Sequence, residues 1–104
     1  KKALPPDGEI INASDIISGL RIIKSQNEIA LLKEAHSITE VVLDDILGKI
    51  KPGLTEKEVA GMVLESIYRN GAEREAFPQY IFSGVTTRNA ISNTTYKKLE
   101  KNEK

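Results

Sequence analysis

The sequence predicts an α+β fold in which two main amphipathic helices pack on a few antiparallel strands. Two capping-box patterns, Ser25 to Glu28 and Thr55 to Glu58, are each followed by apolar residues at helical spacing, and these predict the helices. A strand is predicted at residues 79–83, which are rich in aromatic and β-branched side chains and lie between a proline and a glycine. With 104 residues, the chain fits one small domain or a part of a larger one.

The first predicted helix begins after Ser25, whose side-chain oxygen can accept from a free amide while Glu28 reaches back to the serine backbone. Gly48 marks its end, and the pair Pro52-Gly53 forces a turn. Its expected apolar face consists of Leu31, Leu32, Ala35, Ile38, Val42, Leu43 and Ile46. Polar residues at the intervening positions make the helix amphipathic.

The second predicted helix begins after Thr55, and Leu54 with Val59 has the arrangement of a hydrophobic staple across its start. Asn70-Gly71 is typical of a left-handed helix end. Its expected buried stripe consists of Val59, Met62, Val63, Ser66 and Ile67. Two such helices joined by a short turn are expected to form an antiparallel hairpin.

The strand expected at residues 79–83 would cover the helices, with residues 86–95 forming turns or a weak second strand. Phe77, Tyr80 and Phe82 flank this strand, and we expect their alternate burial in a sheet rather than a role in a pocket wall. One or two strands do not form a sheet that covers two apolar helix faces. We therefore expect a domain that is incomplete at its C-terminal end.

Composition excludes several classes of function. Fifteen basic and fifteen acidic residues give zero net charge, so we expect no nucleic-acid partner. No apolar run approaches the ~20 residues that a membrane-spanning helix needs, and the start of the chain has no secretory signal, so we expect a cytoplasmic protein that does not enter membranes. With no cysteine and one histidine, thiolate catalysis and the usual zinc sites are excluded within this chain.

Three polar residues of the first predicted helix are candidate functional groups. His36 could act as a ligand or as an acid or base, but no second histidine accompanies it, so we expect a packing role at the helix border. The side chains of Asp44 and Asp45 diverge by about 100° on a helix and are poorly placed to hold one ion together. We expect both aspartates to lie on a solvated face.

The sequence contains an ordered set of short blocks: Leu20-Arg21-Ile22-Ile23-Lys24-Ser25, Glu28-Ile29, Ala35, Lys51-Pro52-Gly53-Leu54-Thr55-Glu56 with Val59-Ala60, Gly71-Ala72, and Phe82-Ser83-Gly84. This set resembles the opening of the catalytic domain of pita-bread metallohydrolases, a family that includes Xaa-Pro aminopeptidases and dipeptidases, methionine aminopeptidases and creatinase. The blocks are most similar to the Xaa-Pro peptidase and creatinase branch. The resemblance spans roughly residues 20–104.

The resemblance implies a fold and a domain division. The chain would supply the first half of a pita-bread fold, with its two helices packed on one face of a curved antiparallel sheet. Residues 1–19 would be the linker from a separate N-terminal domain that this chain does not contain. Residues 20–104 would be the N-terminal portion of the catalytic domain, which is incomplete here.

The resemblance also implies a metal site that this chain does not carry. Members of the family hold two divalent ions, manganese, cobalt or zinc, with two aspartates, a histidine and two glutamates, all C-terminal to the segment present here. Such ions lower the pKa of a shared water so that it attacks a carbonyl. We therefore expect no metal ligand in this chain, and metal ions only in an active full-length parent.

Active Xaa-Pro peptidases usually place a histidine seven residues after the glycine of the Ser-Gly pair, and that position here is Ile91. Isoleucine neither donates a hydrogen bond nor moves a proton, so no catalytic residue is predicted in this chain. By resemblance, the loop after Gly84 approaches the mouth of the active site. Arg88 and Asn89 in that loop are the residues we expect nearest to substrate.

The leading hypothesis is a fragment of a metal-dependent hydrolase that resembles Xaa-Pro peptidases, with the fragment itself inactive. Its parent would hydrolyse a peptide bond next to proline, or a related C–N bond as in creatinase, and only the parent would bind a peptide substrate. The alternative is a non-catalytic pseudo-hydrolase domain used for binding or dimerisation, which Ile91 favours. A third hypothesis is a stand-alone helical hairpin that mediates interactions. A homodimer in which each copy covers the exposed apolar faces of the other is also expected.

Overall fold

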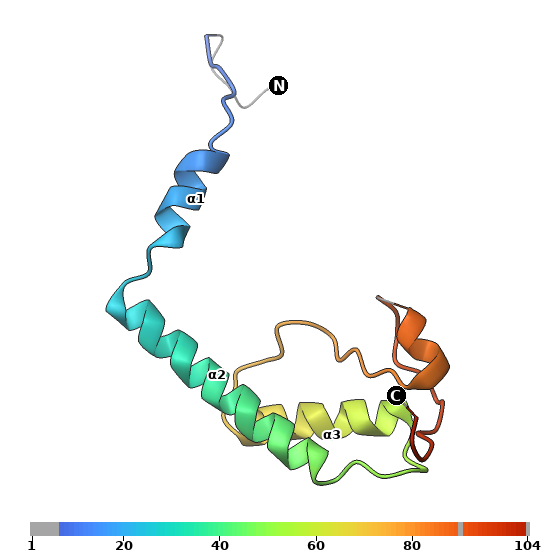
Figure 1. Ribbon diagram of the computed structural model, residues 1–104. Helices are drawn as coiled ribbons and strands as arrows, with labels where there is room; N and C mark the ends of the chain where they lie inside the picture. The colour runs from blue at the N-terminus through green and yellow to red at the C-terminus, as the bar shows by residue number, and fades with distance from the viewer. Residues whose placement is uncertain (1–6, 90, 104) are drawn as a thin grey trace. The chain divides into compact units, whose positions relative to one another are not determined.

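The computed structural model describes residues 7–89 and 91–103. Its helices are α1 (Ser14–Ile22), α2 (Gln26–Leu47) and α3 (Glu56–Arg69), followed by the short 3-10 helix η1 (Gly84–Arg88) (Figure 1). Within the described residues, no helix combines the length and the hydropathy of a membrane-spanning segment. The chain divides into two compact units, Lys1–Leu31 and Leu32–Lys104.

The first unit contains α1 and the start of α2. The side chain of Asn12 accepts from the backbone N–H of Ser14 at 2.9 Å and so satisfies one free donor at the start of α1. At α2, the backbone N–H of Ser25 donates to Glu28 Oε2 at 2.8 Å, and the backbone N–H of Glu28 donates to Ser25 Oγ at 3.3 Å. The predicted capping box at Ser25 is therefore confirmed. The predicted linker at residues 1–19 lies partly outside the described residues and stays a prediction.

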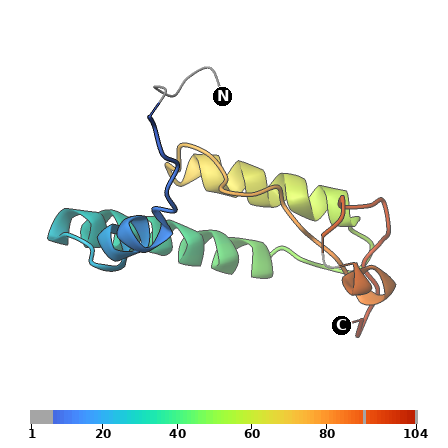
Figure 2. The ribbon, with the colours of Figure 1, turned by 90° about the horizontal axis from the view of Figure 1, so that it is seen from above.

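The second unit contains an antiparallel hairpin formed by α2 and α3, which run side by side (Figures 1 and 2). Its core consists of Val42 and Ile46 from α2 and Val59 from α3. Partly buried side chains pack against this cluster: Ile38, Leu54, Met62, Val63, Ile67, Ile81 and Leu99. The stripe predicted for α3 is confirmed, as is the Leu54 staple, because Leu54 packs on the cluster that contains Val59.

The apolar face predicted for α2 is only half buried. Val42 and Ile46 lie in the core, whereas Leu31, Leu32 and Leu43 are more than half exposed. Helical spacing predicts which face of α2 is apolar. How much of that face is covered depends on the length of the partner helix. Here α3 is 14 residues long against 22 for α2.

The predicted ends of the helices are confirmed by backbone geometry. α2 ends at Leu47, and the turn that follows uses Gly53 with φ of 96°. Gly71 has φ of 89°, and the N–H of Ala72 donates to the carbonyl of Ile67 at 3.3 Å. A residue with a Cβ atom rarely adopts these left-handed conformations, so both glycines stop a helix or reverse the chain cheaply.

Asp45 corrects one expectation, because it joins the two helices rather than lying on a solvated face. Its carboxylate accepts from the buried hydroxyl of Ser66 in α3 at 2.9 Å and pairs with Lys49 at 2.7 Å. Arg69 adds a third, longer contact of 3.4 Å. The Lys49 and Ser66 hydrogen bonds hold the pKa of the Asp45 carboxyl below its usual value. Asp44, its neighbour, is exposed as expected.

No strand is present in residues 7–89 and 91–103, so the predicted packing of the helices on antiparallel strands is not confirmed. Along residues 79–83, backbone groups bond to side chains instead of a neighbouring strand. The hydroxyl of Thr94 donates to the carbonyl of Gln79 at 3.0 Å, and the N–H of Ser83 donates to Glu56 Oε1 at 2.9 Å. One isolated antiparallel bridge joins Thr55 to Lys98.

The aromatic residues near this segment are not buried as predicted. Phe77 is 72% exposed and Tyr80 is 44% exposed, while Ile81 is the side chain that packs on the core. Tyr80 and Phe82 instead stack on each other, with ring centroids 6.4 Å apart. Phe82 is half-buried like Ile81, so burial does not alternate strictly along residues 79–83. His36 is also exposed, with Nε2 3.4 Å from Glu40 Oε1, rather than packed at a helix border.

Replacing Ser66 by alanine tests the link between the helices. The change leaves the Asp45 carboxylate without one partner, and we expect the free energy of unfolding to fall by about 1–2 kcal/mol. Urea unfolding of this chain, followed by circular dichroism, measures the effect. Ser37→Ala is the matched control, because Ser37 lies on the exposed face of α2, and we expect a change below about 0.5 kcal/mol. Equal losses for both variants would contradict the assignment.

Candidate functional site

The carboxylate of Glu56, the first residue of α3, is the best-connected polar group among the described residues. The residue is completely buried. Its Oε1 accepts from the backbone N–H of Ser83 at 2.9 Å, from the Ser83 hydroxyl at 3.2 Å and from the hydroxyl of Thr86. Its Oε2 accepts from the backbone N–H of Thr95 at 3.1 Å and from the Thr95 hydroxyl at 2.7 Å. One carboxylate therefore holds two separate stretches of chain.

These contacts decide the charge state of Glu56. Burial raises the pKa of the carboxyl, but the hydrogen bonds from Thr86, Thr95 and Ser83 outweigh it and lower the pKa to about 2. The first turn of a helix also favours negative charge, because its free N–H groups carry partial positive charge. Glu56 is therefore an ionised, buried acceptor at neutral pH.

The start of α3 is tied to the C-terminal segment by its own backbone. The N–H of Glu56 donates to the carbonyl of Lys97 at 3.0 Å, and the N–H of Lys57 donates to the carbonyl of Thr95 at 3.1 Å. The N–H of Glu58 donates to the Thr55 hydroxyl at 3.1 Å, which confirms the second predicted capping box. The first three N–H groups of the helix, which have no partner inside it, are thus all satisfied.

The ion pair between Lys97 and Glu103 contacts Ser83, where the loop begins. The Lys97 ammonium group donates to Ser83 Oγ at 3.2 Å and pairs with Glu103 at 2.5 Å. The Lys97 contact lowers the pKa of the Glu103 carboxyl. Gly84 adopts φ of 52°, and a Cβ atom there would lie 1.7 Å from Glu103 Oε1. Position 84 therefore needs glycine for its backbone conformation, and any side chain there would also displace Glu103.

The predicted substrate-proximal residues lie in the loop that begins here. Arg88 ends η1, and its Nε donates to the carbonyl of Val85 at 3.0 Å. The backbone N–H of Asn89 donates to the carbonyl of Thr86 at 3.0 Å. Ile91 is 83% exposed. The structure places all three in one exposed loop, and their proximity to substrate stays a prediction.

The sequence does not predict Glu56 as the centre of a hydrogen-bond network. An acidic residue in the first turn of a helix already has a local explanation, and the capping box drew attention to Glu58 instead. The partners of Glu56 lie 27, 30 and 39 residues further along the chain. The signal present in the sequence is the concentration of serine and threonine at 83, 86, 87, 92, 94 and 95, whose hydroxyls can donate to a carboxylate.

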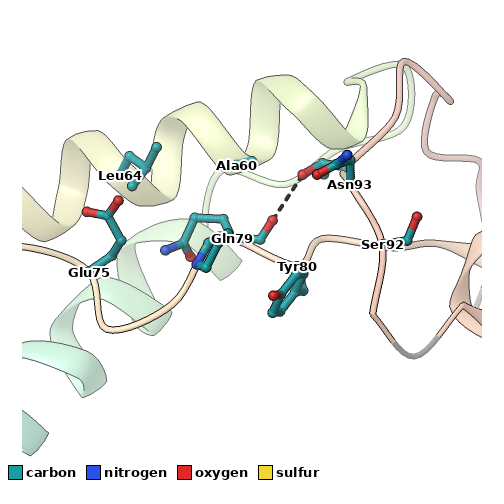
Figure 3. A pocket seen from close by; sticks show the side chains of 9 residues that line it. Ala60, Leu64, Glu75, Gln79, Tyr80, Ser92 and Asn93 are labelled. Carbon is teal, nitrogen blue, oxygen red and sulfur yellow. Dashed lines mark hydrogen bonds between the residues drawn. The ribbon is translucent and has the colours of Figure 1, made fainter. Parts of the chain in front are cut away.

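A small open pocket of about 240 Å³ lies between α3 and the segments that follow it (Figure 3). It is lined by Ala60, Leu64, Glu75, Pro78, Gln79, Tyr80, Ser92, Asn93 and Thr94. Glu75 is held by the hydroxyl of Tyr68 at 2.7 Å, which lowers the pKa of its carboxyl. Among the described residues that line the pocket, Glu75 is the one acidic side chain, and no serine or threonine hydroxyl is hydrogen-bonded to a base that could activate it.

Among residues 7–89 and 91–103, no three histidine, cysteine, aspartate or glutamate side chains gather where they could hold a metal ion. The carboxylate of Glu56 is already saturated by donors, and Asp45 is paired with Lys49 and Ser66. The side chains described here therefore do not fit a two-metal centre.

Comparison with known proteins identifies the class to which this fold belongs. A solved structure of prolidase from Pyrococcus furiosus superposes with a TM-score of 0.79 at 32% identity, covering 86% of this chain and 28% of the prolidase chain. The fold is therefore part of the pita-bread fold of that metallohydrolase class. The model of metallopeptidase family M24 matches residues 30–104, and the chain belongs to this family.

Curated relatives agree with the family assignment. The Xaa-Pro dipeptidase of Pyrococcus horikoshii is 32% identical over 95 residues, which is 91% of this chain and 27% of the relative. The Xaa-Pro dipeptidase of Pyrococcus furiosus is 37% identical over 76 residues, which is 73% of this chain and 22% of the relative. The resemblance inferred from the sequence is confirmed. The chain spans about a quarter of the length of these relatives.

Replacing Glu56 by glutamine tests the buried carboxylate. The amide has one acceptor oxygen in place of two, and we expect the free energy of unfolding at pH 7 to fall by about 2–3 kcal/mol. The folded-state pKa of about 2 lies below the usual 4.5, so the stabilisation from ionised Glu56 is present above about pH 4.5 and is lost as the pH falls through about 2. The difference between wild type and variant therefore shrinks over that range, as urea unfolding at a series of pH values would show.

The matched control is Glu34→Gln, which removes the same charge from the exposed face of α2. We expect it to change the free energy of unfolding by less than about 0.5 kcal/mol at every pH. A constant difference between wild type and Glu56→Gln from pH 7 to pH 2 would be inconsistent with a buried, ionised Glu56.

Proposed function

We propose that this chain is the N-terminal part of the catalytic domain of a family M24 peptidase whose full-length form hydrolyses a peptide bond next to proline. The proposal is carried by one observation, the match to prolidase in both fold and sequence, with a TM-score of 0.79 and 32% identity. The names of the curated relatives, two of them Xaa-Pro dipeptidases, support the same substrate class. Hydrolysis of a related C–N bond, as in creatinase, is the nearest variant of this activity.

In this proposal, the chain supplies a loop and its support rather than the reacting groups. Arg88 and Asn89 approach the substrate from the loop after Gly84. Two divalent ions, manganese, cobalt or zinc, are held by residues that lie outside this segment. The segment alone is inactive under this proposal. The proposal also includes a cytoplasmic location for the full-length protein.

A non-catalytic pseudo-hydrolase is the second candidate, and Ile91 favours it. The position at which active Xaa-Pro peptidases usually carry a histidine holds an apolar side chain that is 83% exposed. Isoleucine cannot take up or release a proton. In this version the fold serves binding or dimerisation. Exposed apolar residues of α2, among them Val41, Leu43 and Leu47, support a homodimer as its assembly.

The full-length protein distinguishes the two candidates. We expect it to hydrolyse Xaa-Pro dipeptides in the presence of manganese, cobalt or zinc, and to lose activity when a chelator removes the metal, because metal-bound water is the nucleophile in this class of reaction. Product release measured by chromatography checks this outcome. Binding of a Xaa-Pro dipeptide without hydrolysis, with any of the three metals, would support the pseudo-hydrolase instead.

Replacing Ile91 by histidine in the full-length protein tests the role of that position. A histidine that assists proton transfer typically contributes 10²–10⁴-fold, so we expect kcat/KM for a Xaa-Pro dipeptide to rise by about tenfold or more. Ile91→Asn is the matched control, because asparagine forms hydrogen bonds but does not titrate, and we expect little gain. Unchanged kcat/KM in Ile91→His would show that the isoleucine does not limit activity.

A further inference from the structure

We infer that Glu56 is a positioning residue for the loop of residues 83–95, which carries Arg88, Asn89 and Ile91. The role of this loop at substrate rests on the proposed function, whereas the clamping of the loop by Glu56 does not. Glu56 itself is not proposed to react with substrate, because its carboxylate is buried and already accepts hydrogen bonds on both oxygens.

The two carboxylate oxygens of Glu56 bind opposite ends of the loop. Oε1 accepts from Ser83 and Thr86 where the loop leaves the core, and Oε2 accepts from Thr95 where it returns. Both ends are therefore fixed to one side chain. A loop closed in this way loses much of the conformational freedom that its length would otherwise allow.

The group that closes the loop is itself rigidly held. Glu56 is the first residue of α3, and Val59, one turn later, lies in the core with 1% exposure. The backbone N–H of Glu56 is also bonded to Lys97. The clamp therefore transmits the position of a packed helix to the loop, as supporting groups do for sites that must be held within a fraction of an ångström.

Exposure changes along the loop in the way this role requires. Ser83, Thr86 and Thr95 at the base are partly buried, whereas Arg88 and Ile91 are exposed. The connection from base to tip is short, because Thr86 binds Glu56 through its hydroxyl and Asn89 through its carbonyl. The base is held while the side chains predicted to approach substrate remain accessible.

A clamp that is only structural and a clamp that positions the loop at substrate differ in how their loss affects kcat and KM. Loss of a purely structural clamp lowers stability but leaves KM and kcat of the folded protein unchanged. Loss of a positioning clamp changes the placement of groups at substrate, and a displacement of about 1 Å can reduce a rate by about 100-fold. The test must therefore measure both loop opening and kinetics.

The experiment uses the full-length protein and two matched pairs of variants. Glu56→Gln is compared with Glu58→Gln, which removes the same charge from the same turn of α3, where Glu58 is exposed and hydrogen-bonds to Thr55 rather than to the loop. Thr86→Val is compared with Thr87→Val, because Thr86 bonds to Glu56 while Thr87 is exposed and bonds to Gly84. The Thr86 pair keeps the Glu56 charge and provides the test if Glu56→Gln does not fold.

Hydrogen exchange followed by mass spectrometry reports on the loop, and steady-state hydrolysis of a Xaa-Pro dipeptide reports on positioning. We expect Glu56→Gln and Thr86→Val to exchange about tenfold faster or more in residues 83–95, with the core of α3 unchanged and kcat/KM reduced by about tenfold or more. Glu58→Gln and Thr87→Val should leave the loop exchange and kcat/KM near wild type.

Unchanged exchange of residues 83–95 in both Glu56→Gln and Thr86→Val would overturn the clamp. Faster exchange with wild-type KM and kcat would overturn the positioning role and leave Glu56 as a structural group. A wild-type protein that hydrolyses no Xaa-Pro dipeptide would refute the proposed function, and the same kinetic result would remove the positioning role at substrate. The exchange comparison would still decide whether Glu56 clamps the loop.

Discussion

The described structure of the second unit depends on one buried negative charge at the start of α3. A carboxylate without compensation is costly to bury, and Glu56 is compensated by hydrogen-bond donors rather than by a basic side chain. Because those donors come from Ser83 and η1 and from Thr95, the charge organises parts of the chain that share little apolar contact. The side chain of Glu56 and the backbone bonds at the start of α3 together hold these distant segments in place.

The hydrophobic core explains why such a polar anchor matters. Among the residues that the structure describes, Val42, Ile46 and Val59 form the buried cluster, and Ala60 is also buried. Apolar burial therefore secures the α2–α3 hairpin, and it extends to the segments that flank the loop through Ile81 and Leu99. The Asp45–Ser66 hydrogen bond adds a second polar link, again between elements that helical periodicity alone does not connect. Apolar packing holds α2 and α3 together, and polar contacts fix the loop of residues 83–95 to this helix pair.

Sequence reasoning recovered the features that depend on near neighbours. Both capping boxes, the glycine turns at Gly53 and Gly71 and the α3 stripe follow from residues within a few positions of one another, and the family was recognised from ordered blocks. The failures concern distant partners. Local spacing predicts a solvated Asp45, because its partner Ser66 lies 21 residues further along the chain. The burial of Ile81 in place of Tyr80 depends on which face of an extended segment meets the helices. Glu56 was missed for the same reason.

The separation between Glu56 and Thr95, 39 residues along the chain, has a consequence for the order of folding events. Helices form from local contacts in about a microsecond, whereas contacts across long stretches of chain require loop closure first. We therefore expect α2 and α3 to pair early and the Glu56 contacts to form late. During synthesis, α3 emerges with its first residue charged and still hydrated, and Glu56 acquires its first partner only after 27 further residues have been made and its last only after 39.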